Sequence, residues 1–287
     1  MSVQTPPTRR RRRLRGLLIA GGAACLFILV AIVGPLVVTY DPITTHIADR
    51  LKPPFSTLDN GTLTIFGTDQ VGRDLLPQIL QGARISLLVG LATVTAAGLI
   101  GLAAGVLAGF YGGALDAIVM RLADIQLGFP TILLAILIAA VLGPSVTNVI
   151  ITLSLTRWVT FGRVARAATL TTREREYVLA ARALGCNHLR LLWHHVMPAT
   201  LAALIVIATV EVGLVIVAEA SLSFLGLGTP PDQPSWGLIV ANGRAYINTA
   251  WWISTLPGAA LSLVVIAVGN LGDQLRDYLD PRTSIQA

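Results

Sequence analysis

The chain has 287 residues, of which 54% are hydrophobic and only 13% are charged, and its formal net charge is +6. A soluble domain of this size carries about a quarter of its residues as charges. The composition therefore excludes a soluble domain and indicates a membrane protein.

Long apolar runs divide the sequence into segments that fit a bilayer. A hydrocarbon core about 30 Å thick requires about 20 residues of helix at 1.5 Å per residue. The run 125–156 is long enough for two helices and breaks at Gly143–Ser145, where proline lacks an N–H donor and glycine tolerates a turn. We therefore predict an all-α membrane protein with six transmembrane helices: residues 16–40, 85–115, two helices within 125–156, 198–225 and 252–271.

The arginine-rich segment RRRRRLR, Arg9–Arg15, precedes the first of these helices. The positive-inside rule places such a segment in the cytoplasm, and six crossings return the C-terminus to the same side. The polar segment between the fourth and fifth helices is then cytoplasmic as well. Its own arginines favour that side independently: Arg173, Arg175, Arg182 and Arg190.

Two other interpretations of the N-terminal region carry less weight. A basic cluster can be a nucleic-acid-binding arm, but beside an apolar span it is far more often a topology signal, so we expect a lipid bilayer and no nucleic acid as its partner. The first helix could be a cleaved signal peptide. Its apolar stretch exceeds the 7 to 15 residues typical of that class, and no small-x-small cleavage pattern follows it.

These spans predict how the chain is organised. We expect a basic cytoplasmic tail (1–16), a first transmembrane helix (17–40), an extracytoplasmic segment (41–83), a five-helix core (84–275) with a polar cytoplasmic segment at 171–198, and a cytoplasmic C-terminal tail (276–287).

No motif for chemistry stands out in the sequence. The phosphate-binding loop of P-loop ATPases ends in Gly-Lys-Ser/Thr, and the single lysine here, Lys52, lies in RLKPPF. Any ATP-driven motor must therefore be a separate subunit that contacts a cytoplasmic surface. His188, His194 and His195 have no Cys or acid at ligand spacing, so we predict no catalytic, cofactor or metal site in this chain.

The polar cytoplasmic segment contains LAARALGCNHLRLLWHHVMP, which resembles the Glu-Ala-Ala loop of ABC importer permeases. That loop reads Glu-Ala-Ala, three residues, Gly, nine residues, Ile-x-Leu-Pro, and this chain matches it at Ala180, Ala181, Gly185 and Pro198. Leu179, His195 and Met197 depart from the pattern, although YVLAARALG fits the YVxAARAxG form of the peptide-importer branch.

The spacing of this segment has a physical rationale. Small residues at 180, 181 and 183 allow a partner helix to approach closely, Gly185 divides the helix into two short pieces, and Pro198 begins the next span, where its missing donor does no harm. The resemblance implies that this elbow is a coupling helix docked in a groove of an ATPase. Its implied coupling residues are Glu176, Ala180, Ala181, Arg182, Gly185 and Pro198.

Three further segments, Phe66–Gly90, Glu219–Gly237 and Gly269–Arg282, resemble C-type permease subunits of the dipeptide, oligopeptide and nickel importers. The likeness extends over residues 17–282. It implies a type I ABC importer (MetI-like) permease fold in a bacterial inner membrane with both termini cytoplasmic. The implied partners are a B-type second permease, two ATPases that bind ATP and Mg, and an extracytoplasmic substrate-binding protein.

Two acidic residues, Glu211 and Glu219, lie within the predicted spans, and Arg157 directly follows the apolar run 125–156. Arg157 and Glu211 each lie about 18 to 20 Å along their helix from its end, close to the midplane, where an unpaired charge costs about 2.5 to 3.5 kcal/mol. We therefore hypothesise that they pair across the wall of a translocation path; the alternative is that Arg157 reaches water and Glu211 is protonated. Glu219, near the outer end of the fifth helix, either contacts ligand or pairs at the interface. At the start of the third helix we expect Arg121 to pair with Asp124.

The function expected from the resemblance is the permease subunit of an ATP-driven importer for di- or oligopeptides, working by alternating access. Nickel or glutathione are alternatives within the family. An ion-gradient-driven secondary transporter is an alternative from another class, but the sequence shows neither internal repeats nor helices broken at the midplane. A polytopic membrane enzyme is a third possibility, weakened because neighbouring spans hold no cluster of His, Asp or Glu.

Overall fold

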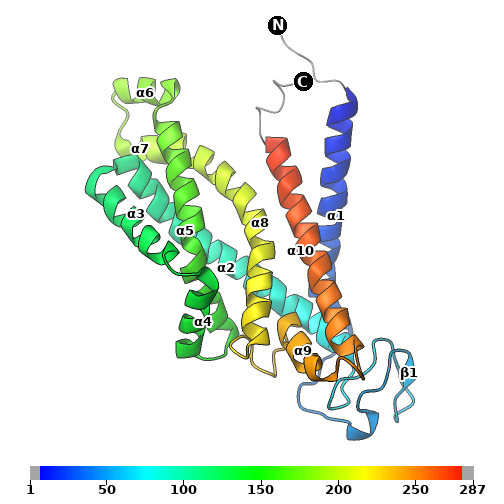
Figure 1. The fold of residues 1–287 in the computed structure, drawn as a ribbon. Coiled ribbons are helices and arrows are strands. Elements are labelled where there is room, and N and C mark those ends of the chain that lie inside the picture. Colours follow the sequence, from blue (N-terminus) through cyan, green and yellow to red (C-terminus); the bar gives the residue numbers. More distant parts are fainter. Residues whose placement is uncertain (1–6, 280–287) are drawn as a thin grey trace.

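A computed structural model describes residues 7–279 and is almost entirely helical (Figure 1). The tail residues 1–6 and 280–287 lie outside the described residues. The helices are α1 (Pro7–Val37), α2 (Leu75–Tyr111), α3 (Gly113–Leu127), α4 (Thr131–Leu142), α5 (Val146–Arg173), α6 (Glu176–Ala183), α7 (His188–Leu191), α8 (Met197–Phe224), α9 (Trp236–Gly243) and α10 (Trp252–Leu279). Short elements add to them: the 3-10 turns η1 (Ile47–Asp49) and η3 (Arg244–Tyr246), a π-helical turn η2 (Leu192–Val196), and strands β1 (Ser56–Thr57) and β2 (Leu63–Thr64).

Four stretches in the described part of the chain are long and apolar enough to cross a membrane. They are residues 18–37, α2, the continuous helix 188–224 and residues 252–277. A fifth candidate is the pair α3 and α4, which bends by 89° at its break. The expected mostly helical membrane fold is confirmed at this level, but α5, although 28 residues long, is too polar to count as an apolar span.

Several predicted helix bounds differ from the structure. The second span begins at Leu75, where the carboxylate of Asp74 accepts a hydrogen bond from the Leu76 N–H, ten residues before the expected start. The third span is interrupted at 128–130, a Gly-Phe-Pro sequence in which proline ends the preceding helix. The break at Gly143 is as predicted, because α4 ends at Leu142 and Gly143 has a φ of +80°.

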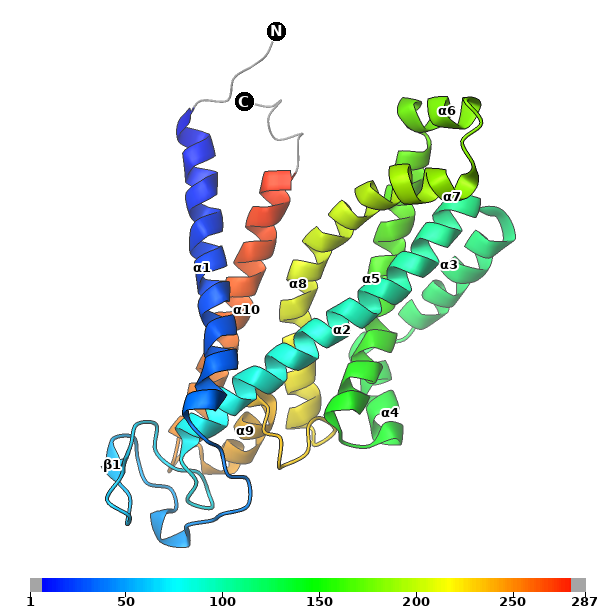
Figure 2. The same ribbon diagram turned by 180° about the vertical axis from the view of Figure 1, so that it is seen from behind.

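The two views of the ribbon place α6 and α7 at the same end of the molecule as the start of α1 and the end of α10 (Figures 1 and 2). The β hairpin and α9 lie at the other end, with the turn between α4 and α5. Helix α2 runs obliquely from the second end to the first, while α8 and α10 pack together near α9 and diverge toward the chain termini.

Helices α2 and α5 contact each other backbone to backbone. Gly101, Gly105 and Gly109 recur every four residues on the face of α2 that meets α5. A Cβ added to Gly105 would lie 2.2 Å from the carbonyl oxygen of Gly162, and one added to Gly109 would lie 3.0 Å from the carbonyl oxygen of Arg166. Small residues allow this close approach between membrane helices, so the two helices form one closely packed pair.

Two tryptophans hold the segment 38–74 and the start of α2 against α9 and α10. The indole N–H of Trp252, at the start of α10, donates to the carbonyl of Thr68 at 3.1 Å, and that of Trp236 in α9 donates to the carbonyl of Ile79 at 2.9 Å. Within the segment, the side-chain hydrogen bond from Lys52 holds the pKa of Asp49 below its usual value. These contacts attach the segment to α2, α9 and α10.

Candidate functional site

The segment from α6 to α7 projects from the end of α5. Helix α6 is anchored by the buried Val178, and most of its other side chains are exposed. Exposed apolar side chains gather on this elbow: Tyr177 is 46% exposed, Leu179 43% and Leu184 89%. Because exposed apolar patches rimmed by polar residues mark interaction surfaces, the elbow has the character of a docking site.

The structure shows how the elbow turns. Helix α6 ends at Ala183, and Gly185 has a φ of +83°, a backbone conformation that glycine adopts without a steric penalty. The side chain of Asn187 then caps α7 by accepting from the N–H of Leu189 at 2.7 Å. Gly185 therefore separates α6 from the helix that starts at His188, so the break predicted at Gly185 is present.

The predicted coupling residues differ in exposure. Glu176, Ala180, Arg182 and Gly185 are exposed, and Ala181 is half-buried. Pro198 lies in the first turn of α8, as predicted, although α8 is not separated from the helix before it. A π-helical turn joins α7 to α8, so that one continuous helix runs from 188 to 224 with Pro198 inside it. A π-helical turn holds one residue more than an α-helical turn, and such turns within helices often occur at functional sites.

The elbow is connected to the body of the protein by the arginine at the end of α5. Arg173 donates from Nη1 to the carbonyl of Gly109 at 2.7 Å, in the last turn of α2. A basic side chain at this place satisfies a carbonyl that the helix itself leaves unpaired. The C-terminal ends of α5 and α2 are thus joined directly beneath α6.

Two other arginines of α5 bind α3. Arg166 holds Asp116 through two hydrogen bonds, and Arg163 Nη2 lies 2.6 Å from Asp124 Oδ1. The expected pair of Arg121 with Asp124 is therefore wrong, because Asp124 has its partner on the neighbouring helix. Spacing along α3 could not reveal this choice, which depends on how α5 packs against it.

Arg157 of α5 and Glu211 of α8 meet inside the helical body. Arg157 Nη1 lies 3.5 Å from Glu211 Oε2, with 22% and 7% of the two side chains exposed. The contact is longer than a good charged hydrogen bond, and both Arg157 Nε and Glu211 Oε2 are buried without a hydrogen-bond partner among the described residues. The two residues are therefore neighbours, as hypothesised, in an incompletely satisfied pair.

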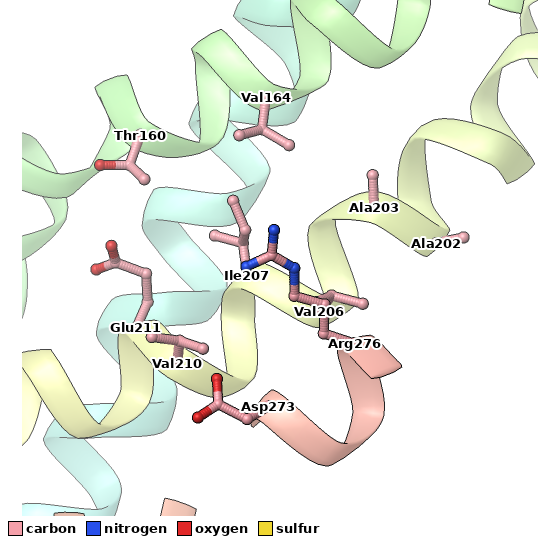
Figure 3. A pocket seen from close by; sticks show the side chains of 10 residues that line it. All are labelled: Thr160, Val164, Ala202, Ala203, Val206, Ile207, Val210, Glu211, Asp273 and Arg276. Atoms are coloured by element: carbon pink, nitrogen blue, oxygen red, sulfur yellow. The ribbon is translucent and has the colours of Figure 1, made fainter. Parts of the chain in front are cut away.

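A groove of about 640 Å³ opens between α5, α8 and α10 where α8 and α10 diverge (Figure 3). Its walls are largely apolar, with Val164 from α5 and Ile207 from α8. Its polar groups are Glu211 of α8 and two residues of α10, Asp273 and Arg276. Sequence reasoning assigned no role to these last two, although the run GDQLRDYLD at the end of an apolar span is a visible signal.

Glu219 has a different environment from Glu211. It is fully buried, and its carboxylate accepts hydrogen bonds from Ser223 at 2.7 Å and from Ser86 at 3.3 Å. Ser235, before α9, contacts the same Ser223 hydroxyl at 3.1 Å. Glu219 does not line the groove; its contacts link α8 to α2 and α9 and favour a structural role over contact with ligand.

Nothing in residues 7–279 resembles a metal centre, because no three His, Cys, Asp or Glu side chains there cluster closely enough to hold an ion. His188 instead packs edge-on against Phe110, with 6.0 Å between the ring centroids.

Comparison with known proteins gives concordant results. Residues 101–285 match the family described as the binding-protein-dependent transport system inner membrane component. The chain is 42% identical over 258 residues to a di/tripeptide transport system permease protein of Pseudomonas aeruginosa, covering 90% of this chain and 85% of that protein. It is 41% identical over 278 residues to a putative peptide transport system permease protein of Brucella suis, covering 97% and 92%.

Two further similarities broaden the comparison. A glutathione transport system permease protein of Pectobacterium atrosepticum is 36% identical over 284 residues, covering 98% of this chain and 93% of that protein. A chain of the MetNI methionine ABC transporter, solved in inward-facing conformations, superposes with a TM-score of 0.58 at 18% identity over 71% of this chain and 97% of that one, which shows a common fold. The chain belongs to the family of inner membrane components of binding-protein-dependent transport systems.

Proposed function

We propose that this chain is the C-type permease subunit of an ATP-driven importer for short peptides. The names of the relatives that are 41% and 42% identical support peptides as the substrate class. The permease itself is not an enzyme. Its partners in this proposal are a B-type permease, two ATPases that bind ATP and Mg, and an extracytoplasmic protein that delivers the peptide.

We further propose six membrane crossings. In chain order they are α1, α2, the bent pair α3 and α4, α5, α8 and α10. Helix α5 has 28 residues, which span about 42 Å at 1.5 Å per residue. Its arginines lower its hydropathy, but three of them are paired with acids: Arg157, Arg163 and Arg166. The end that holds the start of α1, the end of α10 and α6 is the cytoplasmic one in this proposal, which the arginines of the N-terminal segment support.

In this proposal the elbow formed by α6 and α7 docks on an ATPase, and α5 and α2 transmit its movement. The observation that carries the proposal is the junction below the elbow. Arg173 binds the end of α2, and the glycines of α2 lie directly against the backbone of α5. A movement of α6 therefore displaces the α2–α5 pair as one body, because such closely packed helices cannot slide independently. That displacement opens the path outward when the ATPases close and inward when they separate.

A substitution at the elbow tests the coupling. In Gly185→Leu the new side chain meets no atom of this chain within 4 Å at its Cβ, so it interferes with docking rather than with internal packing. The matched control is Gly143→Leu, which has the same positive φ and the same open space at the opposite end of the molecule. Both changes introduce a backbone strain of about 1 to 2 kcal/mol.

We expect Gly185→Leu to lower ATP-dependent peptide uptake by about tenfold or more, equivalent to at least 1.4 kcal/mol of lost docking energy, and to reduce co-purification of the ATPases. Gly143→Leu should retain both. Equal losses in the two variants would show that strain alone is responsible, and uptake without any ATPase would contradict the proposed function.

The sidedness of the chain is tested separately by labelling single cysteines in intact cells. In a background without Cys25 and Cys186, Leu184→Cys should react with a membrane-impermeant maleimide only after the membrane is opened, whereas Asn60→Cys in the β hairpin turn should react at once. The reverse pattern would overturn the proposed topology.

Glutathione is a second candidate substrate, because one relative at 36% identity is a glutathione permease. Glutathione is itself a short peptide with free amino and carboxyl groups, so competition of glutathione against di-alanine uptake distinguishes the two. An ion-gradient-driven mechanism is not supported, since the family couples transport to a binding protein.

A further inference from the structure

The groove between α5, α8 and α10 contains a buried carboxylate that lacks a hydrogen-bond donor. Glu211 is 5% exposed, lines the groove, and its Oε2 has no hydrogen-bond partner in the described part of the chain. Arg157 approaches that oxygen only to 3.5 Å. Because a buried ionised carboxylate is stable only when paired and hydrogen-bonded, the site has room for a further N–H donor, above all a cationic one.

The rim of the groove carries charges of both signs on α10. Asp273 and Arg276 are exposed, both line the groove, and neither forms an ion pair with a side chain that the structure describes, residues 16 and 18–277. Figure 3 shows their charged groups and the Glu211 carboxylate around the same space. A guanidinium presents a planar fork of donors that suits a carboxylate, whereas the two acids suit an ammonium group.

We propose that this groove binds a short peptide by its two termini, with the amino group at Glu211 and Asp273 and the carboxylate at Arg276. The proposal rests on the function proposed above and identifies the place where that substrate is held. The volume of about 640 Å³ falls within the range of about 300 to 1,000 Å³ typical of small-molecule sites. The apolar walls, such as Ile207 and Val164, accept varied side chains without selecting among them.

Other occupants fit the groove less well. A lone cation would use the carboxylates but would be repelled by Arg276. An acyl chain would cover the apolar walls but would leave Glu211 buried without a donor. A zwitterion satisfies all three charged groups at once, which is why charge complementarity favours the free ends of a peptide.

The test is protection of a cysteine placed in the groove. In the purified, fully assembled complex without the binding protein, Ile207→Cys is combined with replacement of the native Cys25 and Cys186 by serine. Di-alanine with free termini should slow maleimide labelling by about tenfold at roughly nine times its Kd, as mass action requires. N-acetyl-di-alanine and di-alanine amide should protect weakly, and Asn60→Cys, outside the groove, should be unaffected by all three.

Two variants separate the roles of the charged groups. Glu211→Gln should raise the Kd of di-alanine by about tenfold or more, the size expected when a charged hydrogen bond is lost, and should weaken the preference for a free amino group, which Asp273 alone then supports. Arg276→Gln lies at the exposed end of α10, where it does not disturb packing, and should abolish only the preference for a free carboxylate.

The outcomes distinguish this inference from the proposed function. Suppose that the wild-type complex imports di-alanine with ATP, but that the labelling rate in Ile207→Cys is the same with and without di-alanine, or the same with free and blocked termini. The groove proposal is then wrong and the importer proposal stands. Absence of any ATP-driven peptide uptake would refute the proposed function instead. Protection by phosphatidylethanolamine with none by di-alanine would make the groove a lipid site and refute the inference.

Discussion

The closest contact between α2 and α5 offers a sharp test of the proposed rigid pair. A Cβ introduced by Gly105→Ala would lie 2.2 Å from the carbonyl oxygen of Gly162 and 2.7 Å from the Cβ of Ala165. Both obstacles are backbone or the first side-chain atom, so no rotamer change relieves the clash. Overpacking of this kind costs about 1 to 3 kcal/mol. We expect Gly105→Ala to lower the free energy of unfolding by that amount, because α2 and α5 must separate to make room for the new methyl group.

The same substitution at Gly98, two helical turns earlier on α2, is the matched control. Its Cβ would lie 3.8 Å from the ring of Phe161, an ordinary van der Waals distance. Because alanine is favoured over glycine in a helix by about 1 kcal/mol, Gly98→Ala should be neutral or slightly stabilising.

The free energy of unfolding in mixed micelles, followed by circular dichroism, measures both changes. Uptake relative to ATP hydrolysis in reconstituted vesicles then reports coupling, which should fall only in Gly105→Ala. If Gly105→Ala unfolds at the same free energy as Gly98→Ala, α2 and α5 are not packed as described. If Gly105→Ala is destabilised but its peptide uptake per ATP hydrolysed is unchanged, the α2–α5 pair does not transmit the movement.

Three other contacts predict distinct results. Reversal of the pair by Arg157→Glu with Glu211→Arg should restore the assembly that is lost in either single variant, because each single change places two like charges together and removes the partner of a buried charge, at a cost of about 3 to 5 kcal/mol or more. If the exchange gives no better yield of assembled complex than the single variants, the pairing is contradicted. Because Lys52 lowers the pKa of Asp49, the ion pair stabilises the segment 41–74 fully above about pH 4, the value in the unfolded chain, and that effect is lost as pH falls through the lower pKa of the folded state. Protease resistance of residues 41–74 should thus be constant from pH 8 to 5, and Lys52→Met should remove its decline under acid. Arg173→Met leaves a carbonyl at the end of α2 unpaired and should cost about 1 to 3 kcal/mol while lowering uptake per ATP; unchanged coupling would exclude the junction as a transmission point.

Sequence reasoning identified features that depend on composition and local geometry. Apolar run lengths predicted where membrane helices lie, and the glycine with positive φ at 185 was predicted as the turn of the elbow. Distance along each helix brought Arg157 and Glu211 to a common depth, and the structure makes them neighbours. Such inferences succeed because rise per residue and backbone sterics are the same in every helix.

Features that depend on how helices rotate and pack were missed. The partner of Asp124 is Arg163 on another helix, and the groove is completed by Asp273 and Arg276 from the last helix. Neither follows from spacing within one element. The π-helical turn before α8 also escaped prediction, because its extra residue has no local sequence signature comparable to glycine or proline.

Helix α5 is too polar to be recognised as a membrane span from its hydropathy, although its charged side chains are paired inside the helical bundle. Its arginines make it the helix that a search for apolar spans omits, yet each has a definite partner: Glu211 on α8, Asp124 and Asp116 on α3, and the end of α2. A charge that is paired within the bundle costs far less in a bilayer than an isolated one, so the helix can be both polar and membrane-spanning. The same pairs attach α5 to three neighbours along the length that joins the elbow to the groove. In the proposed mechanism, a movement of the elbow would therefore reach Arg157 through α5, and through Arg157 the carboxylate of Glu211.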